Sequence, residues 1–285
     1  MRKVGLVIDS AFDLLDDVKA GLNLEVAKMN IIVDGVSYVD GTEISLTEIL
    51  DAVDAGKKVS TSQPSPQEFV DAYEKLKKQG CTDVLVMTVS TVLSGSYQSA
   101  QIAKELVDGL NMEFVNSKTS AMGGELMIAE VKDMFLNNVE LSLIKITLDE
   151  LVERLEVYLT VDDLSTLVKG GRMSRTQSFI GTLMKIKPIL HVDQEGYIKM
   201  LSKVRTTKRV ISRMIDMISD SLGNIEAPHF RIGHIVAIDV ALEIKYRLLE
   251  RFNKAKVVIS NEITPVVAVH LGKGGFGIAW LKNVK

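Results

Sequence analysis

Two hydroxyl-rich segments carry residues that could bind an anion. Ser60-Thr61-Ser62-Gln63-Pro64-Ser65-Pro66 joins the expected end of a strand to a helix start, and Thr88 to Tyr97 does the same around Ser94 and Ser96. Unpaired backbone N–H groups and the helix dipole favour a negative charge at a helix start. Both turns follow strands, and ligands of α/β proteins gather at the carboxyl ends of strands. Simple capping by Ser65 would explain the first segment alone, but the pair favours an anion site.

His270 follows an apolar run, Val266 to Val269, that we expect to be a strand. A histidine in that place is more often a hydrogen-bonded structural residue than a ligand group. The glycines after it, Gly272 and Gly274, resemble a phosphate-binding loop. Neither a helix nor a Gly-Lys-Ser/Thr ending follows them, so a tight turn between two strands is the better interpretation.

Arg172 is a further candidate, in Gly170-Gly171-Arg172-Met173-Ser174-Arg175. Its guanidinium offers a planar fork for an anion, although a helix C-cap with a solvated arginine is equally consistent. Ser94 and His270 could be the nucleophile and base of a hydrolase, but no Gly-x-Ser-x-Gly elbow surrounds Ser94. We expect no metal site, because the four histidines show no paired spacing.

The composition, 46% hydrophobic and 25% charged, is that of an ordinary globular protein. The net charge of −3 argues against a nucleic-acid or anionic-membrane surface, although Lys203, Arg205, Lys208 and Arg209 form a small basic cluster. The single cysteine, Cys81, suits a reducing compartment. The first residues lack the apolar core of a signal peptide, and no apolar run reaches the roughly 20 residues that span a bilayer. We expect a cytoplasmic protein without stable membrane insertion.

Short β-branched runs alternate with amphipathic helices, which indicates two α/β domains. We place an N-terminal domain at residues 1–157, with a mostly parallel sheet and flanking helices. A C-terminal domain at residues 158–285 has a mixed sheet with helices. The N-terminal strands are expected at Val4–Ile8, Asp83–Val89 and Met112–Asn116, and its helices start at Ser45, Ser65, Tyr97, Ala121 and Thr147. The C-terminal elements are expected at Pro188–Val192, Tyr197–Val204, Thr206–Leu222, Phe230–Ile238, Val240–Phe252, Val257–Ser260, Val266–Leu271 and Gly277–Leu281.

Several short motifs in order along the chain resemble the DegV family of bacterial fatty-acid-binding proteins. That family includes the binding subunits of fatty acid kinase. The likeness spans nearly the whole chain, but Lys273 stands where the family usually has the proline of Gly-Pro-Gly. The motifs are Asp9-Ser10-Ala11-Phe12-Asp13-Leu14, Tyr38-Val39-Asp40-Gly41, Thr61-Ser62-Gln63-Pro64-Ser65, Leu93-Ser94-Gly95-Ser96-Tyr97-Gln98-Ser99-Ala100, Asn116-Ser117-Lys118, Gly171-Arg172-Met173-Ser174 and His270-Leu271-Gly272-Lys273-Gly274.

The resemblance implies a ligand tunnel between or beside the two domains. It implies that Thr61, Ser62, Ser94 and His270 hold a fatty-acid carboxylate, with His270 most effective as a donor when protonated. Arg172 and Arg205 are associated in the family with the polar network or with kinase engagement. Phe179, Ile180, Leu183 and Met184 recur at helical spacing and are candidates for the acyl-chain wall, or else for ordinary core.

The function that follows is non-catalytic. The chain is expected to hold a long-chain fatty acid such as palmitate or oleate without any cofactor. It would present the acid to a partner, an ATP-dependent fatty acid kinase, for phosphorylation that feeds phospholipid synthesis. The alternatives are a serine-dependent hydrolase, a small-molecule kinase or a fatty-acid-sensing regulatory module.

Overall fold

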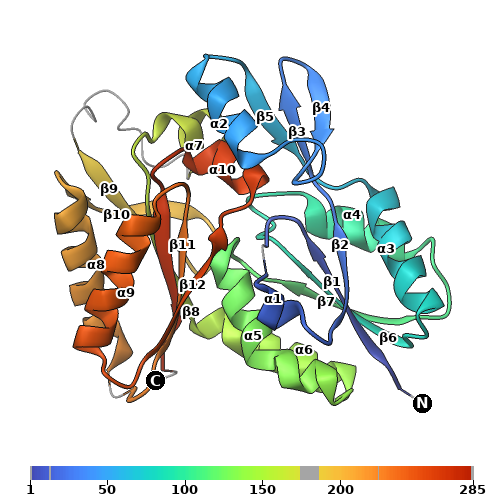
Figure 1. Cartoon of the computed structure of the whole chain (residues 1–285). Coiled ribbons are helices and arrows are strands. Elements are labelled where there is room, and N and C mark those ends of the chain that lie inside the picture. Colours follow the sequence, from blue (N-terminus) through green and yellow to red (C-terminus); the bar gives the residue numbers. More distant parts are fainter. Residues whose placement is uncertain (1, 13, 174–185, 224, 284–285) are drawn as a thin grey trace.

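A computed structural model describes residues 2–12, 14–173, 186–223 and 225–283. The described residues form an α/β fold with a parallel sheet, a small antiparallel sheet and a mixed sheet (Figure 1). The parallel sheet lies on the right of the view and the mixed sheet on the left, with helices between and outside them. The expected α/β class is confirmed.

The parallel sheet has the order β2 (Asn23–Ala27), β1 (Val4–Asp9), β6 (Asp83–Thr88), β7 (Asn111–Asn116). Its two central strands are buried on both faces, as the continuous apolar runs in their sequences require. Helices α3 (Pro66–Lys78) and α4 (Ser96–Lys104) pack on one face. The short α1 (Asp16–Lys19), α5 (Met122–Leu136) and α6 (Leu141–Arg154) pack on the other. All the strands point the same way, so their carboxyl ends share one edge.

The small sheet has the order β4 (Val36–Val39), β3 (Asn30–Val33), β5 (Val59–Ser62), with antiparallel pairing. Asp34 and Gly35 connect β3 to β4, and both have positive φ, as the tightest hairpin turns require. Helix α2 (Leu46–Asp54) begins with the expected capping box of Ser45 and Glu48. This sheet places the end of β5 beside the carboxyl edge of the parallel sheet (Figure 1).

The mixed sheet has the order β10 (Ile198–Val204), β9 (Lys187–Val192), β8 (Leu155–Thr160), β13 (Phe276–Leu281), β11 (His229–His234), β12 (Lys256–Glu262). Helices α8 (Thr207–Leu222) and α9 (Ile238–Arg251) cover one face, and α5 packs against β11 and β13 on the other. Helix α5 therefore lies between the two large sheets (Figure 1). The expected division after residue 157 falls inside β8, whose partners β9 and β13 both belong to the mixed sheet.

Two expected elements are wrong. The run Val266–Leu271 is not a strand but helix α10 (Pro265–Leu271). Five of its six residues are apolar, which fits either structure, and Pro265, which stands at the first helical position, decides for a helix. Gly272 to Gly274 accordingly connect a helix, not a strand, to β13. Thr147 caps no helix, because α6 already starts at Leu141 and the Thr147 hydroxyl donates to the Leu143 carbonyl within it.

Candidate functional site

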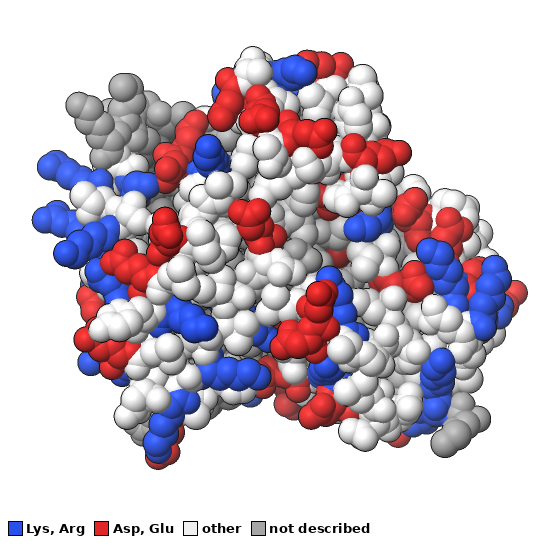
Figure 2. Space-filling view, viewed as in Figure 1, with Lys and Arg blue, Asp and Glu red and all other residues white. Residues whose placement is uncertain are grey.

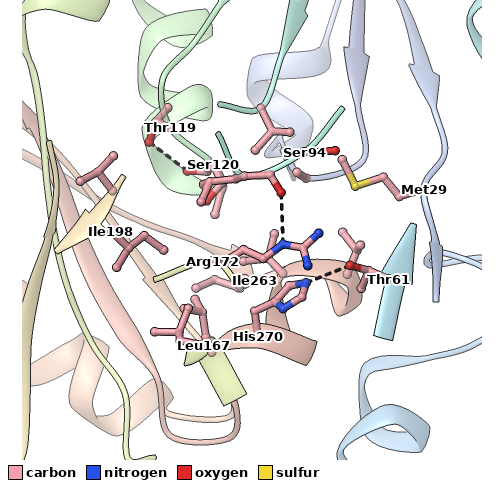
Figure 3. Close-up of a pocket in the computed structure, with 18 of the residues that line it drawn as sticks. Met29, Thr61, Ser94, Thr119, Ser120, Leu167, Arg172, Ile198, Ile263 and His270 are labelled. Atoms are coloured by element: carbon pink, nitrogen blue, oxygen red, sulfur yellow. Dashed lines mark hydrogen bonds between the residues drawn. The ribbon is translucent and has the colours of Figure 1, made fainter. Parts of the chain in front are cut away.

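A cavity lies between the carboxyl edge of the parallel sheet and the mixed sheet. It encloses about 780 Å³ of empty space, part of it open to solvent, which is within the usual range for a small-molecule site. Its polar side chains gather toward one region, around Arg172, Thr61 and His270 (Figure 3). The residues that line it include Met29, Thr61, Ser62, Ser94, Ser120, Met122, Val157, Leu159, Leu167, Arg172, Val192, Ile198 and His270.

Asp9, at the end of β1, organises the loops at this edge. Its carboxylate is fully buried and accepts hydrogen bonds from the backbone N–H of Val89, at 2.9 Å, and of Ala11, at 3.1 Å. Burial raises the pKa of Asp9 to about 6, against the lowering effect of these hydrogen bonds and of the Ser96 hydroxyl. Asp9 thus ties the loop after β6, which carries Ser94, to the end of β1.

The turn that carries Ser94 is held by close polar contacts. The Ser94 and Ser96 hydroxyl oxygens are 2.9 Å apart, and the backbone N–H of Ser96 donates to the Ser94 hydroxyl. Gly95 lies against Gln63, whose Oε1 would be 2.0 Å from any Cβ at that position. Gln63 in turn donates to the Ser99 hydroxyl at 2.9 Å. The two hydroxyl-rich turns predicted from the sequence are therefore in contact.

Helix α10 carries His270 into the cavity. Its start is fixed by Asp40, whose carboxylate accepts from the backbone N–H of Val266 at 3.1 Å. At its last turn the His270 Nε2 atom is 2.9 Å from the Thr61 hydroxyl (Figure 3). Burial and the nearby Arg172 charge lower the pKa of His270 to about 4. The ring is therefore neutral at pH 7, and not in the protonated form in which it would be the most effective donor.

Arg172 follows α7 (Ser165–Lys169) and is half-buried beside His270. Its Nε atom donates to the Leu93 carbonyl at 3.1 Å, and its guanidinium also donates to the Gly170 carbonyl. A Cβ at Gly170 would lie 2.6 Å from Nδ1 of His270, so only glycine allows the ring to approach so closely. Arg172 thus connects the Ser94 loop to the end of α7, beside His270, and brings a positive charge to the cavity.

The structure brings together five of the predicted site residues and leaves one apart. Thr61, Ser62, Ser94, Arg172 and His270 all line the cavity. Arg205 does not: it is exposed beyond β10, where Lys and Arg gather along the left edge of the molecule (Figure 2). The predicted wall residues Phe179, Ile180, Leu183 and Met184 lie outside the described residues.

Sequence reasoning missed the loop between β7 and α5. Thr119, Ser120 and Ala121 line the cavity, and the Thr119 hydroxyl donates to the Ser120 carbonyl (Figure 3). Ala121 and Lys118 have positive φ, a strained conformation for residues other than glycine. The signal was present, because Asn116 to Ser120 is a third polar turn that follows a parallel strand.

The geometry does not assemble a hydrolase. The Ser94 hydroxyl contacts Ser96, and the His270 Nε2 atom contacts Thr61, so Ser94 and His270 do not form a nucleophile–base pair. On its other side the His270 ring faces Gly170 instead of an orienting carboxylate. In the described ranges no three metal-ligating side chains come together, and no helix there is long and apolar enough to cross a membrane.

The comparisons with known proteins decide the family. A family model described as "Uncharacterised protein, DegV family" matches residues 3–283. The chain belongs to the DegV family. A DegV domain-containing protein of Listeria innocua is 34% identical over 280 residues, which cover 98% of each chain.

Solved DegV structures share the whole fold. A fatty-acid-binding DegV protein from Thermus thermophilus has 26% identity and a TM-score of 0.91, with 99% of this chain and 100% of that one covered. A fatty-acid-binding DegV protein from Streptococcus agalactiae has 28% identity and a TM-score of 0.87, with both chains fully covered. The fatty acid kinase B3 protein of Streptococcus pneumoniae, loaded with linoleic acid, shares the fold at 17% identity, with a TM-score of 0.87 over 99% of this chain and 100% of that one.

Proposed function

We propose that this DegV protein binds one long-chain fatty acid and presents its carboxylate to an ATP-dependent fatty acid kinase. The observation that carries the proposal is the cavity itself, with hydroxyls, an imidazole and an arginine in one region of an otherwise apolar lining. An amphiphile with a small acidic head and a long apolar tail fits that distribution. The fatty acids bound by DegV relatives of the same fold support the assignment.

The polar head would be held by Thr61, Ser62, Ser94 and His270. A carboxylate taken out of water without donors costs several kcal/mol, so each buried oxygen needs hydrogen bonds. Two arrangements would give the carboxylate a donor here. In one, the Thr61 hydroxyl turns from the His270 Nε2 atom and donates to the ligand. In the other, His270 takes the tautomer with a proton on Nε2 and donates that proton to the ligand. A carboxylate beside the ring also raises the pKa of His270 again, opposite to the effect of Arg172. Arg172 supplies the countercharge while its own donors remain on the Leu93 and Gly170 carbonyls.

The acyl chain would run along the apolar residues of the mixed sheet. Val157 and Leu159 of β8, Val192 of β9 and Ile198 of β10 face the cavity, with Met122 across from them. Each buried methylene contributes about 0.8 kcal/mol, so the chain supplies most of the affinity. The head residues then select an acid from other lipids of similar length.

Presentation to a kinase, the second part of the proposal, is consistent with the contacts of Ser94 and His270 in the site. Among the described residues the site holds no nucleophile–base pair, so the carboxylate is bound but not activated. The exposed cations around Arg205, on β10 and α8, would contact the partner. The fold shared with the fatty acid kinase B3 protein is consistent with this role.

The binding step is tested by native mass spectrometry of the purified protein and by titration of the delipidated protein with oleate. We expect one bound acid of 14 to 18 carbons. Thr61→Val and Ser94→Ala should each weaken oleate binding about tenfold, because each removes one hydrogen bond to a charged group. Ser60→Ala, at an exposed position next to Thr61 on β5, should bind oleate as the wild type does. A protein that neither carries nor binds an acid would refute the proposal.

The presentation step needs a separate assay, with a purified fatty acid kinase, ATP and the loaded protein. Acyl phosphate should form only when all three are present, and Arg205→Ala should reduce its formation without changing oleate affinity. Binding without acyl phosphate would favour a sensing module. Ester hydrolysis that Ser94→Ala abolishes would favour a hydrolase.

A further inference from the structure

A second cavity lies behind the wall of the first cavity that is formed by Ala11, Met29 and Val266. It encloses about 650 Å³ of empty space, part of it open to solvent, between β1, β2 and the start of α10. Its lining is divided between apolar side chains and a few polar ones. The lining residues are Ile8, Ser10, Phe12, Leu14, Lys19, Leu24, Val26, Lys28, Asp40, Gly41, Thr264 and Pro265.

The two cavities share one wall, in which neighbouring residues of the chain line opposite sides. Ala11 lines the first cavity, whereas Ser10 and Phe12 line the second. In the same way, Met29 lines the first cavity and Lys28 lines the second. At the start of α10, Ile263 and Val266 line the first cavity, and Thr264 and Pro265 line the second. The second cavity is therefore a separate space with its own set of side chains.

Two polar groups at the second cavity are not used by the fold. Lys28 has no hydrogen-bond or ion-pair partner in the part of the chain that the structure describes. The Thr264 hydroxyl oxygen is buried and lacks a hydrogen-bond partner there too. A buried hydroxyl without a partner is costly, so such groups usually serve water or a ligand. Asp40, by contrast, is committed to the Val266 backbone, and Lys19 lies 3.6 Å from Asp16.

We propose that this cavity is a second binding site, for a medium-chain carboxylate. The side chains of Ile8, Phe12, Leu14, Leu24 and Val26 offer an apolar surface for a short alkyl chain. Lys28 offers a charge for the carboxylate, and Thr264 offers a hydroxyl. Its empty space of about 650 Å³ is smaller than the 780 Å³ of the first cavity, so the proposed ligand has a shorter tail, of about ten carbons.

The test uses decanoate as the probe on protein already loaded with oleate. Native mass spectrometry should show a complex with one oleate and one decanoate, and calorimetry should give the decanoate affinity. Lys28→Met keeps the length of the side chain but removes its charge, and should weaken decanoate binding at least fivefold. Lys57→Met, at an exposed lysine that lines neither cavity, is the matched control and should change nothing.

Three outcomes would overturn the proposal: decanoate that enters only by displacing oleate, decanoate affinity unaffected by Lys28→Met, or 1-decanol that binds as tightly as decanoate. Leu24→Trp fills the cavity with an uncharged side chain and should abolish decanoate binding by a different route. The proposal does not rest on what the first cavity holds. If the protein fails to load oleate, a single decanoate lost in Lys28→Met but kept in Thr61→Val still supports the second site.

Discussion

Two of the polar contacts between the N-terminal and C-terminal parts of the molecule differ in charge and accessibility. The Thr61 hydroxyl and His270 Nε2, 2.9 Å apart, are neutral groups in the wall of a cavity. Glu125 of α5 and Arg231 of β11 form an ion pair at 3.6 Å, with side chains 0% and 4% exposed. A neutral contact beside open space can exchange its partner for a ligand, whereas a buried ion pair cannot be opened cheaply. We therefore expect the first contact to serve binding and the second to serve stability.

The largest expected effect comes from breaking the ion pair. Glu125→Ala leaves the Arg231 charge buried and also removes the acceptor of the Ser260 hydroxyl. We expect the free energy of unfolding to fall by about 3–5 kcal/mol in urea denaturation, with little change in oleate affinity of the folded protein. Removing the exposed pair Lys254–Glu226 by Lys254→Ala should cost less than about 1 kcal/mol. A tenfold loss of oleate affinity in Glu125→Ala would erase the distinction between the two contacts.

The second prediction concerns His270 of the neutral contact, whose low pKa makes the free energy of unfolding depend on pH. Unfolded, His270 titrates near 6.5, and folded it titrates near 4, so only the unfolded chain binds its proton between these values. Stability from this group is complete above pH 6.5 and falls as the pH drops toward 4, by up to about 3 kcal/mol. His270→Gln should therefore lose less stability than the wild type between pH 7 and pH 4.

Asp9 has the opposite effect on the pH dependence of stability. The effect of His270 must therefore be measured as the difference between the wild type and His270→Gln. Its pKa is raised from 3.8 to about 6, so the folded form binds the proton first and gains stability as the pH falls through the same range. Wild-type stability alone would show only the sum of the two effects. Unfolding curves of equal pH slope in the wild type and His270→Gln would contradict the low pKa of His270.

The smallest effect should come from Gly170, which lets His270 approach. Its φ is that of an ordinary helical residue, so Gly170→Ala strains no backbone, but the added Cβ would collide with the ring. We expect oleate affinity to fall about threefold to tenfold, with less than about 1 kcal/mol lost from the free energy of unfolding. The control is Ala55→Ser, a small substitution on an ordinary backbone away from the site, which should leave the oleate affinity unchanged. Gly80→Ala is unsuitable as a control because Gly80 has positive φ. If Gly170→Ala left the oleate affinity unchanged, His270 would not be one of the residues that bind the carboxylate.

The same contrast explains how much the sequence could reveal. Ser94 is predictable because it follows β6 of the parallel sheet, and ligands of such sheets gather at the carboxyl ends of the strands. Thr61 was singled out by the same pattern, but it lies on β5 of the small antiparallel sheet, whose place beside that edge is set by packing. His270 was identified by resemblance, yet the element predicted for it was wrong, since a six-residue run with five apolar residues has no decisive period. The apolar lining was not predictable, because Val157, Val192 and Ile198 become lining residues only when the mixed sheet packs at its particular angle. The same holds for Glu125 and Arg231, which pair across 106 residues of sequence by helix–sheet packing alone.

The position of β13 has a consequence for synthesis on the ribosome. It comes last in chain order among the described strands, but it lies between β8 and β11 at the centre of the mixed sheet. Until residues up to about Leu281 have left the exit tunnel, β8 and β11 each lack a neighbour, and Gly277 is not yet beside Met122. The nascent chain can complete its parallel sheet before β13 is made, but the cavity closes only after β13 has emerged. Chaperones that shield open strand edges would therefore meet this chain between the emergence of β8 and that of β13.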